Sequence, residues 1–217
     1  MDALKPSTGL VAMAALMAAA ACSAATREPA GTTPPPRDAS LAAAARADSL
    51  RNSFTSADVG FMTGMIHHHA QALVMARMAP THEASPALQV LAGRVINGQN
   101  DEIALMQQWL RDRNQSVPDP SAPMHGGAHA VHMPGMLTDE QLAELDAARG
   151  ADFDRLFLTT MIQHHQGALT MVEELFSTYG AGQGDAIFKL ASDIGADQSS
   201  EIDRMRTMLR EILFESP

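Results

Sequence analysis

The stretch that decides the fold runs from residue 58 to 75, DVGFMTGMIHHHAQALVM, and it recurs without gaps from 154 to 171 as DRLFLTTMIQHHQGALTM. Apolar residues follow helical spacing in both copies, which predicts two similar amphipathic helices. A second pair of matching segments follows, QNDEIALMQQWL at 99–110 and QSSEIDRMRTML at 198–209. The chain therefore contains an internal repeat, and each repeat predicts one helical hairpin.

Local signals set the expected helix ends. A cap at Thr55 or Ser56 opens the first repeated helix, which ends near Pro80, and Ser85 followed by Pro86 opens its partner. A capping box at 138–141 opens a short helix, a long helix follows over 152–179, and glycines at 180–184 separate it from the last helix at 185–214. Two hairpins predict an all-α four-helix bundle, with one repeat over 39–113, a connector over 114–137 and a second repeat over 138–217.

The first 22 residues predict an export signal. Their apolar segment, Leu10 to Ala21, is shorter than the roughly 20 residues that a membrane-spanning helix needs. Small residues precede Cys22 as in a bacterial lipoprotein, so we expect lipidation of Cys22; ordinary cleavage nearby is the alternative. Either way the sequence predicts an exported protein of the bacterial periplasm or cell envelope, in contact with the membrane only through that lipid. Residues 23–38, rich in Ala, Thr and Pro, predict a disordered tether.

Composition excludes several function classes. The net charge is −10, and an acidic chain without a basic stripe is not expected to bind nucleic acid. One cysteine allows neither an internal disulfide nor a thiolate metal cluster. No catalytic motif is present, so we expect no enzyme activity. Methionine and histidine, at 15 and 9 residues, are conspicuous where aromatic residues make up only 4%.

The histidines of the repeat share the apolar face of their helix. Relative to Met65, His68 lies at about −60°, His69 at about +40° and Met75 at about −80° around the axis. The imidazoles should therefore point into the bundle, where an unpaired polar group costs roughly 1–3 kcal/mol. Their partners could be Glu102 and Glu201, one another through water, or a metal ion.

Metal ligation accounts for the most residues. Thioether and imidazole ligands together favour copper, Cu(I) before Cu(II), over Mg, Ca or Zn. The predicted ligands are Met65, His68, His69, Met75, Met161, His164, His165 and Met171, with Glu102 and Glu201 as secondary candidates. Met106, Met205 and Met208 are expected to be core packing. His67 is expected to face solvent, because its counterpart in the second repeat is Gln163.

The connector is a second candidate for metal capture. It holds three histidines and three methionines within a short stretch, namely Met124, His125, His129, His132, Met133 and Met136. Flexible tracts of this composition take up soft metals without a preformed site. A plain linker is the alternative.

These motifs resemble the family called domain of unknown function 305, whose hallmark is Phe-x-x-x-Met-Ile-x-His-His followed by a methionine. Residues 61–75 and 157–171 both match, as does Met133-Pro-Gly-Met136, and the resemblance spans roughly residues 50–214. It implies a ferritin-like bundle, an envelope location and copper binding. The implied ligands are the eight methionines and histidines of the two repeats.

Three functions compete. The first is copper sequestration or trafficking in copper tolerance, with a delivery partner that the sequence does not identify. The second is a ferritin-like enzyme with a dinuclear metal centre built from His68, His164, Glu102 and Glu201, although the Glu-x-x-His motif of that class is missing from the chain. The third is a metal-free structural or interaction bundle with a pH-sensitive histidine core.

Overall fold

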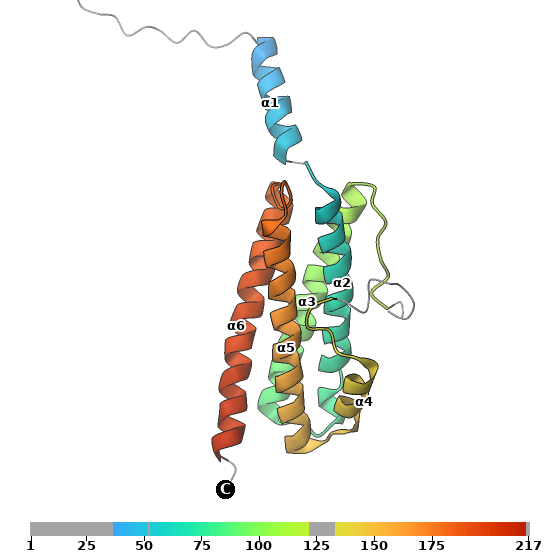
Figure 1. Cartoon of the computed structure of the whole chain (residues 1–217), viewed down its shortest axis with the longest axis vertical. Helices are drawn as coiled ribbons and strands as arrows, with labels where there is room; N and C mark the ends of the chain where they lie inside the picture. The colour runs from blue at the N-terminus through green and yellow to red at the C-terminus, as the bar shows by residue number, and fades with distance from the viewer. Residues whose placement is uncertain (1–36, 52, 122–132, 216–217) are drawn as a thin grey trace, which may run out of the picture.

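The computed structural model describes residues 37–51, 53–121 and 133–215, and all regular secondary structure in these ranges is helical (Figure 1). The elements are α1 (Arg37–Arg51), α2 (Ser56–Ala76), the short 3-10 helix η1 (Ala79–Thr81), α3 (Pro86–Asp112), α4 (Asp139–Ala147), α5 (Gly150–Ser177) and α6 (Asp185–Glu215). The all-α prediction is confirmed. The predicted export signal, Cys22 and the predicted tether up to residue 36 lie outside the described residues, as do Met124, His125, His129 and His132.

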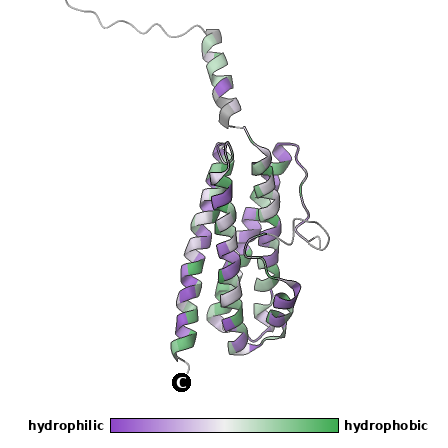
Figure 2. Ribbon diagram, viewed as in Figure 1, coloured by the Kyte–Doolittle hydropathy of each residue, from purple (hydrophilic) through white to green (hydrophobic). Residues whose placement is uncertain are grey.

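The four long helices lie side by side. Each hairpin packs internally, α2 on α3 and α5 on α6, and α2 also packs on α5, whereas α3 and α6 contact each other much less. The chain direction reverses from α2 to α5, α4 lies beside the lower end of the bundle, and α1 lies beyond its upper end (Figure 1). Hydrophobic and hydrophilic residues share each long helix, as expected of amphipathic helices (Figure 2).

The helix ends follow the predicted caps. Thr55 and Asp58 form a capping box at α2, Ser85 caps α3 with Pro86 in the first turn, and Thr138 with Gln141 forms the box at α4. Some boundaries differ slightly from expectation, since α2 ends at Ala76 and not near Pro80, and α5 ends two residues early at Ser177. Helix α1 begins at Arg37, two residues inside the predicted tether, and α5 begins at Gly150, two residues before its predicted start.

A buried aspartate in each repeat holds the turn of the other repeat. Asp58 of α2 accepts a hydrogen bond of 2.6 Å from the backbone N–H of Gly182, in the turn between α5 and α6. Asp154 of α5 accepts from the backbone N–H of Ser85, in the turn between α2 and α3, at 3.2 Å. The first residue of the repeated motif thus fastens the two hairpins together.

The core has two hydrophobic clusters, one toward each end of the bundle. Met106 lies in the first, which also contains Trp109, and Met205 lies in the second, so both are core residues as predicted. Met208 packs against the second cluster and is partly buried. No helix in the described ranges is long and apolar enough to cross a membrane.

Candidate metal centre

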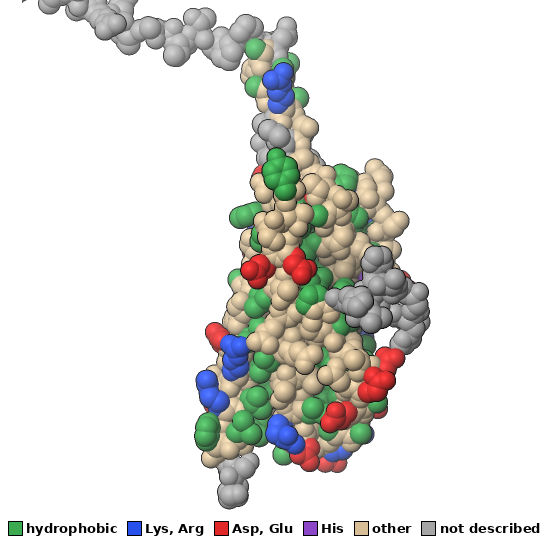
Figure 3. All heavy atoms as spheres, viewed as in Figure 1, with side chains coloured by type: hydrophobic (Ala, Val, Ile, Leu, Met, Phe, Trp, Pro, Cys, Tyr) green, Lys and Arg blue, Asp and Glu red, His purple; other side chains and the backbone are tan. Residues whose placement is uncertain are grey.

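The repeated histidines meet at the centre of the bundle. His68, His69, His164 and His165 are fully buried, as predicted. Because α2 and α5 run in opposite directions, the middles of the two motifs lie at the same level, and the rings of His68 and His164 come within 3.9 Å, centroid to centroid. We refer to these four side chains as the histidine layer. The face drawn in Figure 3 shows scattered acidic, basic and apolar side chains and hardly any histidine.

Three rings of the histidine layer donate a proton through Nε2. The Nε2 of His69 lies 2.7 Å from Glu102 Oε2, and the Nε2 of His165 lies 2.6 Å from Glu201 Oε2. The Nε2 of His68 lies 3.0 Å from the carbonyl oxygen of Pro134. A carbonyl or an ionised carboxylate only accepts, so each of these rings, when neutral, carries its proton on Nε2. The lone pair on Nδ1 is therefore available.

That lone pair has no partner in any of the four rings. Nδ1 of His68, His69, His164 and His165 is buried without a hydrogen bond, and so is Nε2 of His164. A buried polar atom left unpaired costs roughly 1–3 kcal/mol, so the layer is unfavourable as a purely structural core. Imidazoles that ligate metals commonly donate their other N–H to a carboxylate or a backbone carbonyl, as three of these rings do.

Burial keeps three rings of the layer uncharged. Desolvation, followed by the proximity of His69, lowers the pKa of His68 to about 3. Desolvation, followed by His165, lowers the pKa of His69 to about 3, and desolvation holds the pKa of His164 well below its usual value. Neutral rings keep the lone pairs that a metal ion needs. Burial and the nearby Glu201 carboxylate raise the pKa of Glu102 to about 7.

The predicted methionines flank the histidine layer in two pairs. Met65 of α2 and Met171 of α5 share the first hydrophobic cluster, and Met75 and Met161 share the second. All four are buried. Along the axis, Met65 lies about 4.5 Å before His68, and Met75 lies about 9 Å beyond His69. Thioether sulfur is thus present on both sides of the layer.

A short segment of the connector closes over one side of the layer. In this segment, residues 133–137, the carbonyl of Pro134 receives the His68 proton, and Leu137 exchanges two hydrogen bonds with the side chain of Gln71, at 2.9 and 2.8 Å. A Cβ on Gly167 would lie 1.9 Å from the carbonyl oxygen of Pro134, so α5 admits the segment only because residue 167 is glycine.

The 133–137 segment also brings one connector methionine to the centre. Met133 Sδ and Met171 Cε both lie within 4 Å of the position that a Cβ on Gly64 would take. Gly64 precedes His68 by one helical turn, so Met133 joins the Met65 and Met171 side of the layer. Met136, the other described connector methionine, is half-buried.

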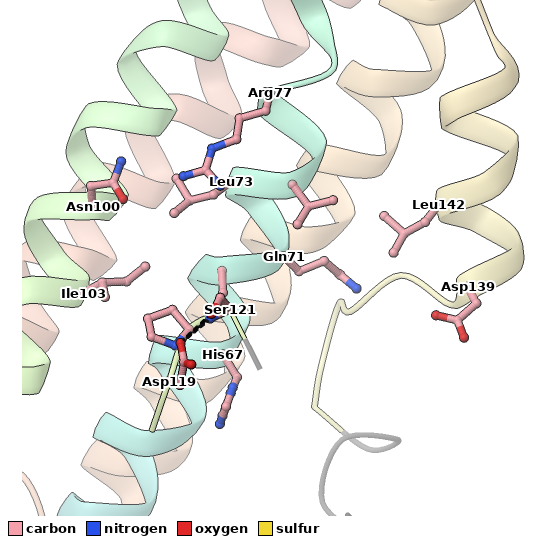
Figure 4. Close-up of a pocket in the computed structure, with 13 residues that line it drawn as sticks. His67, Gln71, Leu73, Arg77, Asn100, Ile103, Asp119, Ser121, Asp139 and Leu142 are labelled. Carbon is pink, nitrogen blue, oxygen red and sulfur yellow. Dashed lines mark hydrogen bonds between the residues drawn. The ribbon is translucent and has the colours of Figure 1, made fainter. Parts of the chain in front are cut away.

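His67 does not simply face solvent, contrary to expectation. Its ring is half-buried with Nδ1 enclosed, and burial lowers its pKa. It borders an open pocket of about 600 Å³ between α2, α3, α4 and residues 119–121. Figure 4 shows His67 near Asp119 and Ser121, with Arg77 and Asn100 toward the other end of the pocket. The connector that follows α3 encloses this ring, which helical periodicity alone could not foresee.

Two further polar side chains in the core escaped the sequence analysis. Gln99 of α3 and Gln198 of α6 are buried beside Glu102 and Glu201. Their shared place in both repeats was the available signal. In the described part of the chain, no three histidine, cysteine or carboxylate side chains are grouped so that they could hold one ion by themselves. A complete soft-metal site here would therefore include methionine sulfur or require side chains to rotate.

Several solved structures resemble the fold of this chain. A DUF305 fragment from Deinococcus radiodurans is 28% identical with a TM-score of 0.62, and the match covers 73% of this chain and 98% of that one. A DUF305 protein from Streptomyces coelicolor, for which secretion is a prediction, is 27% identical with a TM-score of 0.61, covering 72% and 93%. CopM in its Cu(II)-bound form is 32% identical with a TM-score of 0.57, covering 71% and 96%. CopM in its Cu(I)-bound form is 30% identical with a TM-score of 0.55, covering 73% and 98%.

No curated protein matches the chain. A family profile does, and its description is "Domain of unknown function (DUF305)". The match runs over residues 58–209 and so includes both copies of the motif and the second helix of each hairpin. The chain belongs to the DUF305 family.

Proposed function

We propose that this protein binds copper as its cargo, Cu(I) in preference to Cu(II), and sequesters or passes on the metal without a catalytic step. The observation that carries the proposal is the histidine layer, in which four buried rings have an unpaired Nδ1. Three of these rings are oriented by a carboxylate or a carbonyl at Nε2. A metal ion would supply the missing partner for the lone pairs.

The surrounding ligands favour a soft ion. Met65 and Met171 on one side of the layer, Met75 and Met161 on the other, supply thioether sulfur, which suits Cu(I) better than Zn, Mg or Ca. Met133 adds one more sulfur beside Met171. CopM, at 30–32% identity, has been solved with Cu(I) and with Cu(II), which supports copper as the cargo of this chain.

The rest of the sequence completes the proposal. Export through residues 1–22, lipidation at Cys22 and a tether would place a ferritin-like bundle of two hairpin repeats in the bacterial periplasm or cell envelope. The part of the connector that holds Met124, His125, His129 and His132 would capture the ion before the layer holds it. The partner is the metal ion itself, and neither nucleic acid nor a membrane-spanning helix has a role.

The test is an anaerobic Cu(I) titration of residues 23–217 against a competing chelator, with Zn(II) and Fe(II) in parallel. We expect copper-selective binding that is lost when His68, His69, His164 and His165 are all changed to Ala. The matched control replaces His67 and His82, which lie outside the layer, and should bind as wild type does. Equal binding by the four-histidine variant, or no copper selectivity in the wild type, would refute the proposal.

A further inference from the structure

A second polar site lies between α3 and α6, on the other side of the histidine layer from the 133–137 segment. These two helices contact each other much less than α2 contacts α3 or α5 contacts α6, and the groove between them holds about 170 Å³. Gln99 and Glu102 of α3, with Gln198 and Glu201 of α6, line it from equivalent positions of the two repeats. We refer to this space as the α3–α6 groove.

The two amides in the groove lack partners. Gln99 is 2% exposed and Gln198 is 1% exposed, so water reaches neither side chain freely. Nε2 and Oε1 of Gln99 and Oε1 of Gln198 make no hydrogen bond. Buried amides are nearly always paired, so amide oxygens left open toward a carboxylate-lined space indicate an additional ligand.

The charges in the groove favour a cation. Glu102 and Glu201 use Oε2 for the imidazoles of the layer, which leaves Oε1 of each for a ligand in the groove. Asp197 also lines the groove, and burial together with Glu102 and Glu201 raises its pKa. Carboxylates this close repel one another, and a bound cation relieves the repulsion.

Two arginines line the groove as well, but toward its mouth. Arg94 and Arg204 are exposed, whereas both glutamines are buried and both glutamates are largely buried. The positive charges therefore lie on the solvent side. The buried part of the lining includes the carboxylates of Glu102 and Glu201 and the amides of Gln99 and Gln198.

We propose that the α3–α6 groove binds a partly hydrated divalent cation of the magnesium, manganese or calcium class through Glu102, Glu201, Gln99 and Gln198. Carboxylate and amide oxygens with water are the ligands that such hard ions prefer, and soft Cu(I) disfavours them. The site is chemically distinct from the histidine and methionine centre. It does not depend on the proposed copper function.

Mn(II) is a suitable probe, because free aqueous Mn(II) gives a strong EPR signal that weakens on binding. We expect one bound Mn(II) per chain in the metal-free full-length protein. The double variant Glu102→Gln with Glu201→Gln removes both charges but keeps an oxygen that accepts the His69 and His165 protons. It should weaken Mn(II) binding by roughly tenfold or more. Gln99→Leu with Gln198→Leu, which replaces the unpaired amides by apolar groups and should fold, is expected to weaken it too.

Two controls decide where the ion binds. Asp101→Asn with Asp203→Asn removes the same charge from exposed positions of α3 and α6 outside the groove, and should leave Mn(II) binding unchanged. His68→Ala with His164→Ala removes part of the proposed copper centre and should also leave Mn(II) binding unchanged. Absence of Mn(II) binding in the wild type, or an equal loss in the Asp101 and Asp203 control, would overturn the inference. Cu(I) titration of the same variants reports separately on the copper proposal.

Discussion

At the scale of single residues, His164 differs from the other members of the histidine layer. His68, His69 and His165 each have one hydrogen bond at Nε2, but both ring nitrogens of His164 are buried and unpaired. Without a metal ion the His164 ring therefore carries a desolvation cost that no hydrogen bond of normal geometry offsets. The residue that is worst for the stability of the metal-free protein would be among the best placed to bind metal.

His164→Leu should separate these two properties. Leucine has a similar size and no polar atom to bury, so we expect the metal-free variant to be more stable than wild type by about 1 kcal/mol in urea unfolding. Its Cu(I) affinity should fall. The control is His82→Leu, because His82 is buried but its Nε2 reaches both Asp146 O, at 2.9 Å, and Asp146 Oδ1, at 3.0 Å. The free energy of unfolding of His82→Leu should fall by roughly 1–3 kcal/mol. Equal destabilisation of both variants would contradict the argument.

The sequence could identify the four histidines because the repeat placed them twice on an apolar face. It could not identify which nitrogen of each ring is free. That depends on Glu102, Glu201 and Pro134, which come from other elements and lie 33, 36 and 66 positions away from their histidines. Gln99 and Gln198 recur at the same place in both repeats, but what their side chains face depends on how α3 and α6 lie beside each other.

At the scale of elements, the 133–137 segment is held in place by contacts that no local sequence pattern predicts. Pro134 lies against Gly167, and Leu137 pairs with Gln71. Helix caps such as Thr55 with Asp58 could be predicted, because the signal is confined to one turn of chain. The closure of the layer could not, because it depends on a glycine in α5 leaving room for a segment that precedes α4.

Gly167→Ala tests this closure. The added methyl group would overlap the Pro134 carbonyl, so we expect a loss of about 1–3 kcal/mol in unfolding free energy. Displacing Pro134 also removes the Nε2 partner of His68, which should weaken Cu(I) binding by roughly tenfold or more. Gly93→Ala is the matched control, because a Cβ there meets nothing within 4 Å. Because alanine favours a helix more than glycine does, Gly93→Ala should raise the free energy of unfolding by roughly 0.5–1 kcal/mol and leave Cu(I) binding unchanged. If Gly167→Ala binds Cu(I) with wild-type affinity, the 133–137 segment does not contribute to the site.

At the scale of the whole molecule, the two repeats depend on each other. Asp58 and Asp154 each hold a turn of the opposite hairpin, and the His68 and His164 rings meet across α2 and α5. The number of hairpins followed from the sequence, because the repeat is nearly regular. Their pairing did not, since many arrangements bury the same apolar faces. The histidine layer forms because α2 packs directly against α5, which brings the His68 and His164 rings together.

Binding at the layer should therefore stabilise the whole bundle. A ligand present at a hundred times its dissociation constant adds about 2.7 kcal/mol to the free energy of unfolding. For a domain of this size that corresponds to a rise in Tm of roughly 5–10 °C, measured by anaerobic calorimetry with buffered Cu(I). In the variant that lacks all four histidines of the layer the rise should disappear. If the Tm still rises in this variant, the copper that stabilises the fold is bound outside the layer. A ligand raises the Tm only through a site that the folded protein retains.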